Sequence, residues 1–116
     1  MKYYFIFLFL LFLQPSYSQE IKNQKILNFE TKKEMMDYMK KEISAPLGVK
    51  CSYCHNVRDF ASDEKKEKEI TRQMMIMTNS INKSTMTPLA YEPVNCWTCH
   101  QGNTNPFRSK AISPKK

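Results

Sequence analysis

Cys51-Ser52-Tyr53-Cys54-His55 and Cys96-Trp97-Thr98-Cys99-His100 are the two stretches that decide the fold of this 116-residue chain. Together they contain all four cysteines and both histidines of the sequence. Each reads C-x-x-C-H, the attachment sequence for c-type haem. Cysteines three residues apart lie about one helical turn apart, so both thiols can bond to the vinyl groups of one porphyrin, and the next residue brings an imidazole to the iron. The predicted haem anchors are Cys51, Cys54, Cys96 and Cys99, and the predicted proximal ligands are His55 and His100.

Three other interpretations of the cysteines explain less. A redox disulfide does not require a histidine after each cysteine pair. A zinc-binding structural module would use four cysteines, but the histidine that follows each pair would then be a coincidence. A disulfide framework leaves the duplicated spacing unexplained. We therefore expect two haem c groups, with their iron, as the cofactors.

Composition also favours a core that is not built from side chains alone. The chain is 41% apolar, but residues 19–116 hold only 35 apolar residues in 98, about 36%, against about 45–50% in ordinary soluble domains. A chain of this length forms one domain at most and is too short for a large multi-site enzyme. We expect the haems to occupy the centre.

The N-terminal segment has the pattern of a secretory signal peptide. Met1-Lys2 gives a positive start, residues 3–13 are an unbroken apolar run, and Ser16-Tyr17-Ser18 offers small residues for cleavage near Ser18. The run is shorter than the roughly 20 residues of a transmembrane helix, so we expect a periplasmic protein without a transmembrane anchor. The predicted organisation is a signal peptide at 1–18, a polar leader at 19–30, a dihaem cytochrome c domain at 31–105 and a basic disordered tail at 106–116.

Two helices are predicted between these boundaries. Thr31-Lys32-Lys33-Glu34 is a capping box that starts a helix from Lys32 to about Ile43, which Pro46 and Gly48 end. A second helix is expected to begin near Ser62-Asp63-Glu64 and to carry an apolar stripe at helical spacing; the stripe is formed by Ile70, Met74, Met77 and Ile81. The alternating charges of residues 63–69 indicate a solvated face with pairs such as Glu64–Lys68. No alternation long enough for a sheet is present, so the expected fold is all-α, with few helices packed around two haems.

Methionine is the predicted sixth ligand at both irons. Both histidines are used as proximal ligands, and methionine is the usual alternative. The favoured residues are Met39 for the first haem and Met74 for the second, because each lies on a predicted helix upstream of its motif. Met36 and Met35 are alternatives to Met39, and Met77 is an alternative to Met74; Met86 is weaker, since its surroundings read as a loop.

The chain resembles the cytochrome subunit of photosynthetic reaction centres. The similarity lies in Leu47–Asn56 and Phe60–Ser62, in Arg72–Met77 followed by Ile81-Asn82, and in Val94–Gly102. It covers about residues 35–102. That family's subunit carries four haems as two pairs, and this chain is similar to one pair.

The resemblance also implies axial ligands. The family's methionine-bearing helices fall on Met74 for the second haem and on Met39 for the first, where the stretch to Leu47 is one residue longer than in the family. The family's histidine sixth ligand has no equivalent, and Pro88 stands near its place. The other pair of haems is absent, so a photosynthetic role is not implied.

The expected function is extracytoplasmic electron transfer without substrate turnover. The formal charge of +7 favours docking onto acidic surfaces of redox partner proteins, and association with a membrane electron-transfer complex is compatible with the resemblance. Binding to nucleic acid is not expected of an exported haem protein. The alternative is a dihaem, peroxidase-like enzyme with one open iron, which would need acid/base groups that no remaining histidine supplies.

Overall fold

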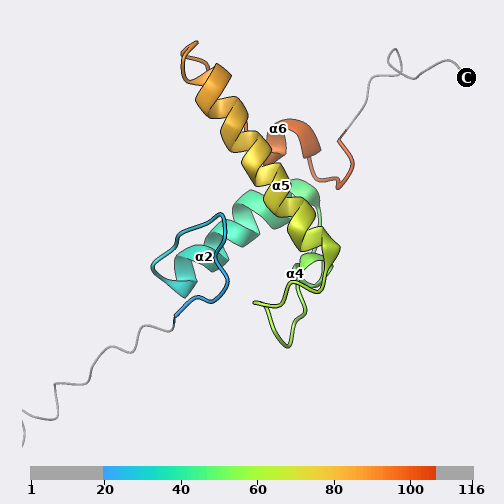
Figure 1. Ribbon diagram of the computed structural model, residues 1–116. Coiled ribbons are helices and arrows are strands. Elements are labelled where there is room, and N and C mark those ends of the chain that lie inside the picture. Colours follow the sequence, from blue (N-terminus) through green and yellow to red (C-terminus); the bar gives the residue numbers. More distant parts are fainter. Residues whose placement is uncertain (1–19, 107–116) are drawn as a thin grey trace, which may run out of the picture.

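Helices form all the regular structure in residues 20–106, the part of the chain that this computed structural model describes (Figure 1). Within that range there is no strand, and the one β-bridge joins Asn56 to Asp59. The all-α prediction is therefore confirmed for these residues. The elements are α2 (Lys32–Tyr38), η1 (Met39–Ser44), α3 (Ala45–Leu47), α4 (Cys51–Cys54), α5 (Lys66–Ile81), η2 (Asn82–Met86) and α6 (Cys96–His100).

The predicted signal peptide at 1–18 and residues 107–116 of the predicted tail lie outside the described residues. Within the described residues, no helix combines the length and apolar character needed to cross a bilayer.

The first helical segment begins where the sequence predicts. Thr31 Oγ1 accepts a hydrogen bond from the backbone N–H of Glu34 (3.2 Å), and the Glu34 carboxylate accepts one from the N–H of Thr31 (3.3 Å). The segment then runs beyond Ile43, through the π-helix η1 and the short α3, to Gly48. A π-helical turn contains more residues than an α-helical one, so η1 holds more residues per turn than α2 before it.

Helix α5 begins later than the sequence predicts. Its first residue is Lys66, so the predicted start at Ser62–Glu64 is wrong. Ser62 instead closes a local turn, since its Oγ accepts from the N–H of Glu64 (3.3 Å). The Asp63 carboxylate is drawn to cations elsewhere, among them Arg72 (2.9 Å). These contacts hold residues 62–64 in a turn that does not continue into the helix.

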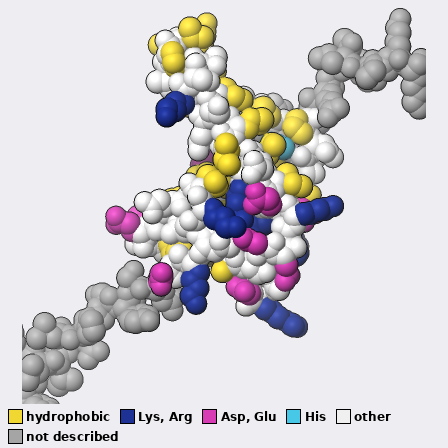
Figure 2. All heavy atoms as spheres, viewed as in Figure 1, with side chains coloured by type: hydrophobic (Ala, Val, Ile, Leu, Met, Phe, Trp, Pro, Cys, Tyr) yellow, Lys and Arg dark blue, Asp and Glu magenta, His cyan; other side chains and the backbone are white. Residues whose placement is uncertain are grey.

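The polypeptide buries very little apolar surface of its own. Among the described residues, the buried hydrophobic core is Ile43, Cys54 and Met75. Helix α4 packs on α5, and α3 and η1 pack on α6. Figure 2 shows hydrophobic side chains gathered along α5 at the surface; the exposed ones on that helix are Ile70, Met74, Ile76, Met77 and Ile81. The residues α5 buries are Lys68, Arg72 and Met75, so the predicted apolar stripe is left open by the protein itself.

Two glycines join the turns that flank the two motifs. Gly48 has a φ of 65°, and a Cβ placed on it would lie 2.1 Å from the carbonyl oxygen of Gly102. The backbone N–H of Gly102 donates to the carbonyl of Pro46 (2.7 Å). This contact brings the chain after the second motif against the chain before the first, and only glycine fits at position 48.

The substitution Gly48→Ala should therefore destabilise the protein by about 3 kcal/mol or more, because the left-handed conformation costs a side chain about 1–3 kcal/mol and the Cβ also meets backbone. Gly102→Ala is the matched control: its φ is 86°, but a Cβ there meets nothing within 4 Å. Urea unfolding of the haem-loaded protein measures both variants. Equal losses of stability would contradict the close approach of Gly48 to Gly102.

Candidate functional site

Each C-x-x-C-H motif forms a single helical turn, as its spacing predicts. The first motif supplies α4, in which Cys54 is buried and Cys51 is exposed. The second supplies α6, which Asn95 caps by accepting a hydrogen bond from the N–H of Thr98 (3.1 Å). All four thiols are free in the structure. Burial raises the pKa of Cys54 and of Cys96 above the ordinary thiol value.

Both histidines are held in the same way. His55 Nδ1 lies 3.0 Å from the carbonyl oxygen of Phe60, and His100 Nδ1 lies 2.8 Å from the carbonyl oxygen of Asn103. A carbonyl oxygen only accepts, so Nδ1 must be the protonated nitrogen in each hydrogen-bonded ring. In the neutral imidazole Nε2 then carries a free lone pair, and burial lowers the pKa of His55, which favours its neutral form. Metal-ligating histidines are held in this way, by a hydrogen bond from the other ring nitrogen that fixes the tautomer and the orientation of the ring.

A large cavity lies against the first motif. Its volume is about 650 Å³, and Cys51, Cys54 and His55 line it together with α5 and the segment α2–η1. That volume falls within the range of about 300–1,000 Å³ typical of cofactor and ligand pockets. The volume, the two thiols and the imidazole lone pair are what a covalently attached haem requires.

The cavity also gathers methionines from two directions. The predicted ligand Met39 lines it along with His55, and so do the alternatives Met35 and Met36. Met75 of α5 adds a fourth thioether, which was not among the predicted ligands. Nothing in the sequence around Met75, the neighbour of the stripe residue Met74, indicates that it would line the cavity. The structure therefore brings Met39 and His55 to one site, but it does not distinguish Met39 from the other methionines there as the ligand.

The segment before α2 forms another wall of this cavity. Composition predicts only a polar leader at 19–30, yet residues 20–27 line the cavity. Asn23 donates to Asp63 (2.9 Å), and Lys25 pairs with the same carboxylate (2.7 Å). Ile21, Ile26 and Leu27 are apolar interruptions in the polar segment and are the signal that could have indicated a packed role.

Asp63 is the point where this leader segment meets α5. Its carboxylate also pairs with Lys68 (3.2 Å) and Arg72 (2.9 Å). Hydrogen bonds from Arg72 and Lys25 hold the pKa of Asp63 far below its ordinary value. The predicted pair Glu64–Lys68 is wrong, because Lys68 turns inward to Asp63 and is buried instead of lying on a solvated face.

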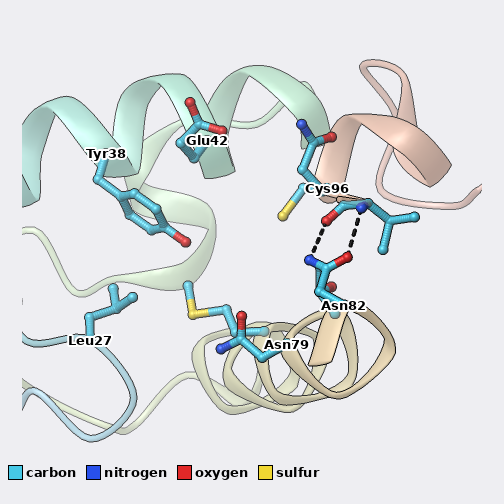
Figure 3. Close-up of a pocket in the computed structure, with 10 residues that line it drawn as sticks. Leu27, Tyr38, Glu42, Asn79, Asn82 and Cys96 are labelled. Carbon is cyan, nitrogen blue, oxygen red and sulfur yellow. Dashed lines mark hydrogen bonds between the residues drawn. The ribbon is translucent and has the colours of Figure 1, made fainter. Parts of the chain in front are cut away.

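A second, smaller cavity of about 180 Å³ lies beside the second motif (Figure 3). Figure 3 shows Cys96 of α6 and Tyr38 of α2 pointing toward it, and Glu42 of η1 also lines it. Asn82 fixes the chain that leads into α6, since its amide donates to the Val94 carbonyl and accepts from the Val94 N–H, both at 2.8 Å. Leu27 and Met75 line both cavities, so the two motifs have neighbouring cavities with a shared wall.

The predicted ligand of the second iron has a different setting. Met74 is 38% exposed on the open stripe of α5. It lines neither of these two cavities, and the same is true of Met77 and His100. The structure leaves Met74 accessible but does not by itself bring it to His100.

In residues 20–106, no three histidine, cysteine or acidic side chains lie close enough together to hold a metal ion such as zinc.

The arrangement of two single-turn C-x-x-C-H helices, each with its imidazole anchored through Nδ1, is that of a c-type cytochrome. The comparisons define the group more narrowly. A family model described as "Photosynthetic reaction centre cytochrome C subunit" matches residues 14–114, and the chain belongs to this family.

Individual relatives agree with the family match. Cytochrome c-554 of Chloroflexus aurantiacus is 34% identical over 86 residues, which are 72% of this chain and 21% of that protein. The photosynthetic reaction center cytochrome c subunits of Rubrivivax gelatinosus and Thermochromatium tepidum are 39% and 36% identical over 48% and 55% of this chain, and over 15% and 16% of their own lengths. The matches thus span about a fifth of these relatives or less. Membership of this cytochrome family agrees with the two C-x-x-C-H motifs and implies covalently bound haem c.

Asp63→Asn should weaken the contact between the leader segment and α5, and it should change how the stability of the protein depends on pH. A carboxyl group whose pKa is depressed by folding stabilises the protein fully above its unfolded pKa, about 3.9 for aspartate, and loses that contribution as the pH falls below this value. The variant should be less stable than the parent at about pH 6 and lose less stability between about pH 6 and pH 3.

Thermal unfolding of the haem-loaded protein at the two pH values provides the measurement. Asp37→Asn is a control, because Asp37 forms only an exposed pair with Lys33 (3.4 Å). If Asp63→Asn and its parent lost equal stability on acidification, the Asp63 cluster would not be the acid-sensitive element.

Proposed function

We propose that the chain is an exported dihaem c-type electron carrier in which each iron has one histidine and one methionine ligand. His55 and Met39 hold the first haem, attached at Cys51 and Cys54. His100 and Met74 hold the second, attached at Cys96 and Cys99. The protein works outside the cytoplasm and exchanges electrons with partner proteins.

The observation that carries the proposal is that both imidazoles are held by the same kind of hydrogen bond. Two histidines far apart in sequence each place Nδ1 on a backbone carbonyl, at 3.0 Å and 2.8 Å, directly after two free thiols one helical turn apart. Hydrogen bonding of Nδ1 orients the ring and raises the basicity of Nε2, which suits a metal ligand. A redox disulfide or a solvent-facing histidine requires none of this.

The helix that carries Met39 supports its assignment. Met39 caps α2 and begins η1, and π-helical turns occur often at functional sites. Met39 therefore lies at the junction of the two helix types, on the segment that lines the first cavity together with His55.

The open stripe on α5 supports the assignment of Met74. Ile70, Met74 and Met77 expose 53%, 38% and 45% of their surface, and contiguous exposed apolar patches on soluble domains mark binding surfaces. A second haem covering this stripe would remove it from water. Met74 is the methionine that the family resemblance places at the iron.

Haem c supplies a one-electron couple when bound. The cysteines of each motif would tether it through thioethers, the histidine Nε2 and the methionine sulfur would be its protein ligands, and Leu27 and Met75 in the shared wall would help to exclude water. A thioether ligand raises the reduction potential. If a histidine and a methionine both bound each iron, no position would be left for substrate, which is why we propose a carrier in place of an enzyme.

The rim of the first cavity indicates the kind of partner. Eight cationic and two acidic side chains line that cavity. Lys68 and Arg72 are buried and pair with Asp63, so the cations of the rim are Lys22, Lys25, Lys32, Lys40, Lys50 and Arg58, and the acids are Glu20 and Asp59. Complementary charge steers electron-transfer partners to the correct orientation. We propose that partner proteins with acidic surfaces, free or within a membrane complex, dock at this rim.

Met39→Ala and Met74→Ala test the axial ligands. Each should remove about half of the near-infrared Met–Fe charge-transfer band of the oxidised protein and lower the reduction potential of one haem, because a thioether ligand is lost. Met36→Ala and Met77→Ala are the matched controls and should leave the band intact. Loss of the band in Met36→Ala but not in Met39→Ala would reassign the first ligand, and a high-spin iron in the parent protein would favour the enzyme alternative.

Docking at the cationic rim predicts electron exchange that slows with salt. Stopped-flow oxidation by an acidic redox protein should slow as ionic strength rises. Lys40→Glu and Lys50→Glu should each reduce the rate, whereas Lys83→Glu, on η2 and outside the cavity lining, should have little effect. Equal effects of all three substitutions would place the docking surface elsewhere.

A further inference from the structure

Lys68 is a buried cation with an unusual set of partners. Its side chain is 11% exposed. Its ammonium donates to three consecutive backbone carbonyls, those of Phe60 (3.0 Å), Ala61 (2.9 Å) and Ser62 (2.7 Å). The nearest carboxylate, that of Asp63, lies farther away at 3.2 Å. A lysine that served only as a counter-ion to Asp63 would have no need of these carbonyls.

One of those carbonyls is the one that holds the first proximal histidine. The oxygen of Phe60 lies 3.0 Å from His55 Nδ1 and 3.0 Å from Lys68 Nζ. A carbonyl oxygen has two lone pairs, and here a neutral imidazole N–H and a cationic ammonium share them. The ring of Phe60 also lies beside the imidazole, with ring centroids 5.3 Å apart. Lys68 is thus connected to the imidazole through one atom.

The second histidine lacks this connection. The carbonyl of Asn103 accepts from His100 Nδ1 at 2.8 Å, and in the described part of the chain it has no lysine or arginine bonded to it. The bond at His100 is also the shorter of the two. The two motifs therefore match in covalent chemistry and differ in the electrostatics behind the imidazole.

The sign of the effect follows from the chemistry of the ligand. A strong hydrogen bond at Nδ1 makes the imidazole a better electron donor, and a better donor favours the oxidised metal. An ammonium on the same carbonyl competes for its electron density and weakens the bond from Nδ1. Its positive charge also disfavours the additional charge of the oxidised state. Both effects raise the reduction potential of the first haem.

We propose that Lys68 is a positioning residue that acts on His55 through the Phe60 carbonyl and makes the first haem the higher-potential member of the pair. This inference rests on the proposed function, since it concerns a haem at His55. At equilibrium a single electron shared by the two sites resides mainly at the first, where the cationic rim lies. Electrons then enter at the second haem and leave at the first.

Lys68→Met and Asp63→Asn test the proposal with shifts of opposite sign. Lys68→Met removes the cation and should move the shared electron about tenfold toward the second haem, equivalent to about 59 mV for a one-electron couple. Asp63→Asn removes the anion that offsets Lys68 and should move it toward the first. Lys65→Met is the control, because Lys65 also donates to a backbone carbonyl, that of Ser52, but not to the one that holds His55.

The measurements are a spectroelectrochemical titration of the dihaem protein and the NMR resonances of the imidazole Nδ1–H protons in the reduced state. In Lys68→Met the resonance of His55 should move downfield as its hydrogen bond strengthens, while that of His100 stays in place. Lys68→Arg keeps the positive charge and should retain a reduction potential of the first haem closer to that of the parent. It is the control for a Lys68→Met variant that acts only by loosening residues 60–62.

The possible outcomes separate the two proposals. Parallel shifts in Lys68→Met and Lys65→Met would mean that only net charge acts and would overturn the role of the carbonyl. Shifts of the same sign in Lys68→Met and Asp63→Asn would indicate a folding defect and overturn the inference while the carrier function stands. A parent protein without covalent haem would overturn the proposed function itself.

Discussion

The fold depends on the space between the segment α2–η1 and helix α5, which is a cavity where most domains of this size have packed side chains. Ile43, Cys54 and Met75, with Pro46 of α3, supply the small buried apolar core among the described residues, and the cavity beside the first motif measures about 650 Å³. A small domain that buries this little apolar area of its own depends on additional stabilisation. Thioether-linked haem meets that need, because it supplies a large apolar plane that cannot dissociate. On this account the haem is both the functional group and the missing core.

The other features of the structure serve that interior. The turns that flank the motifs meet at Gly48 and Gly102, which closes the chain around the two sites. The leader segment forms a wall of the first cavity and is pinned through Asp63 to α5. Leu27 and Met75 belong to both cavities, so the sites are neighbours. On the proposed assignment, similar ligand sets in different electrostatic surroundings would give such a pair a direction for electron flow.

Sequence patterns predicted the parts of the fold that depend on local chemistry. The single-turn motifs, the capping box at Thr31 and the stop at Gly48 are encoded by residues within a few positions of each other, and the structure confirms them. The start of α5 was missed because the contacts of Ser62 and Asp63 hold residues 62–64 in a turn. The role of Lys68 was missed because three of its partners are backbone carbonyls, which leave no mark in the sequence. Alternating charge resembled a solvated face for the same reason. Met39 shares a cavity with His55, whereas the assignment of Met74 still depends on the family resemblance and the open stripe of α5.

The central claim is that two covalently attached haems complete this interior, and the most direct measurement is the intact mass of the exported protein made in a host that matures c-type cytochromes. The account predicts the mass of the processed chain plus two haems. Replacing Cys51 and Cys54 by alanine, or Cys96 and Cys99, should leave one haem in each case. A compact, cooperatively folded product with the mass of the bare polypeptide, or with a single haem in the parent protein, would contradict the account.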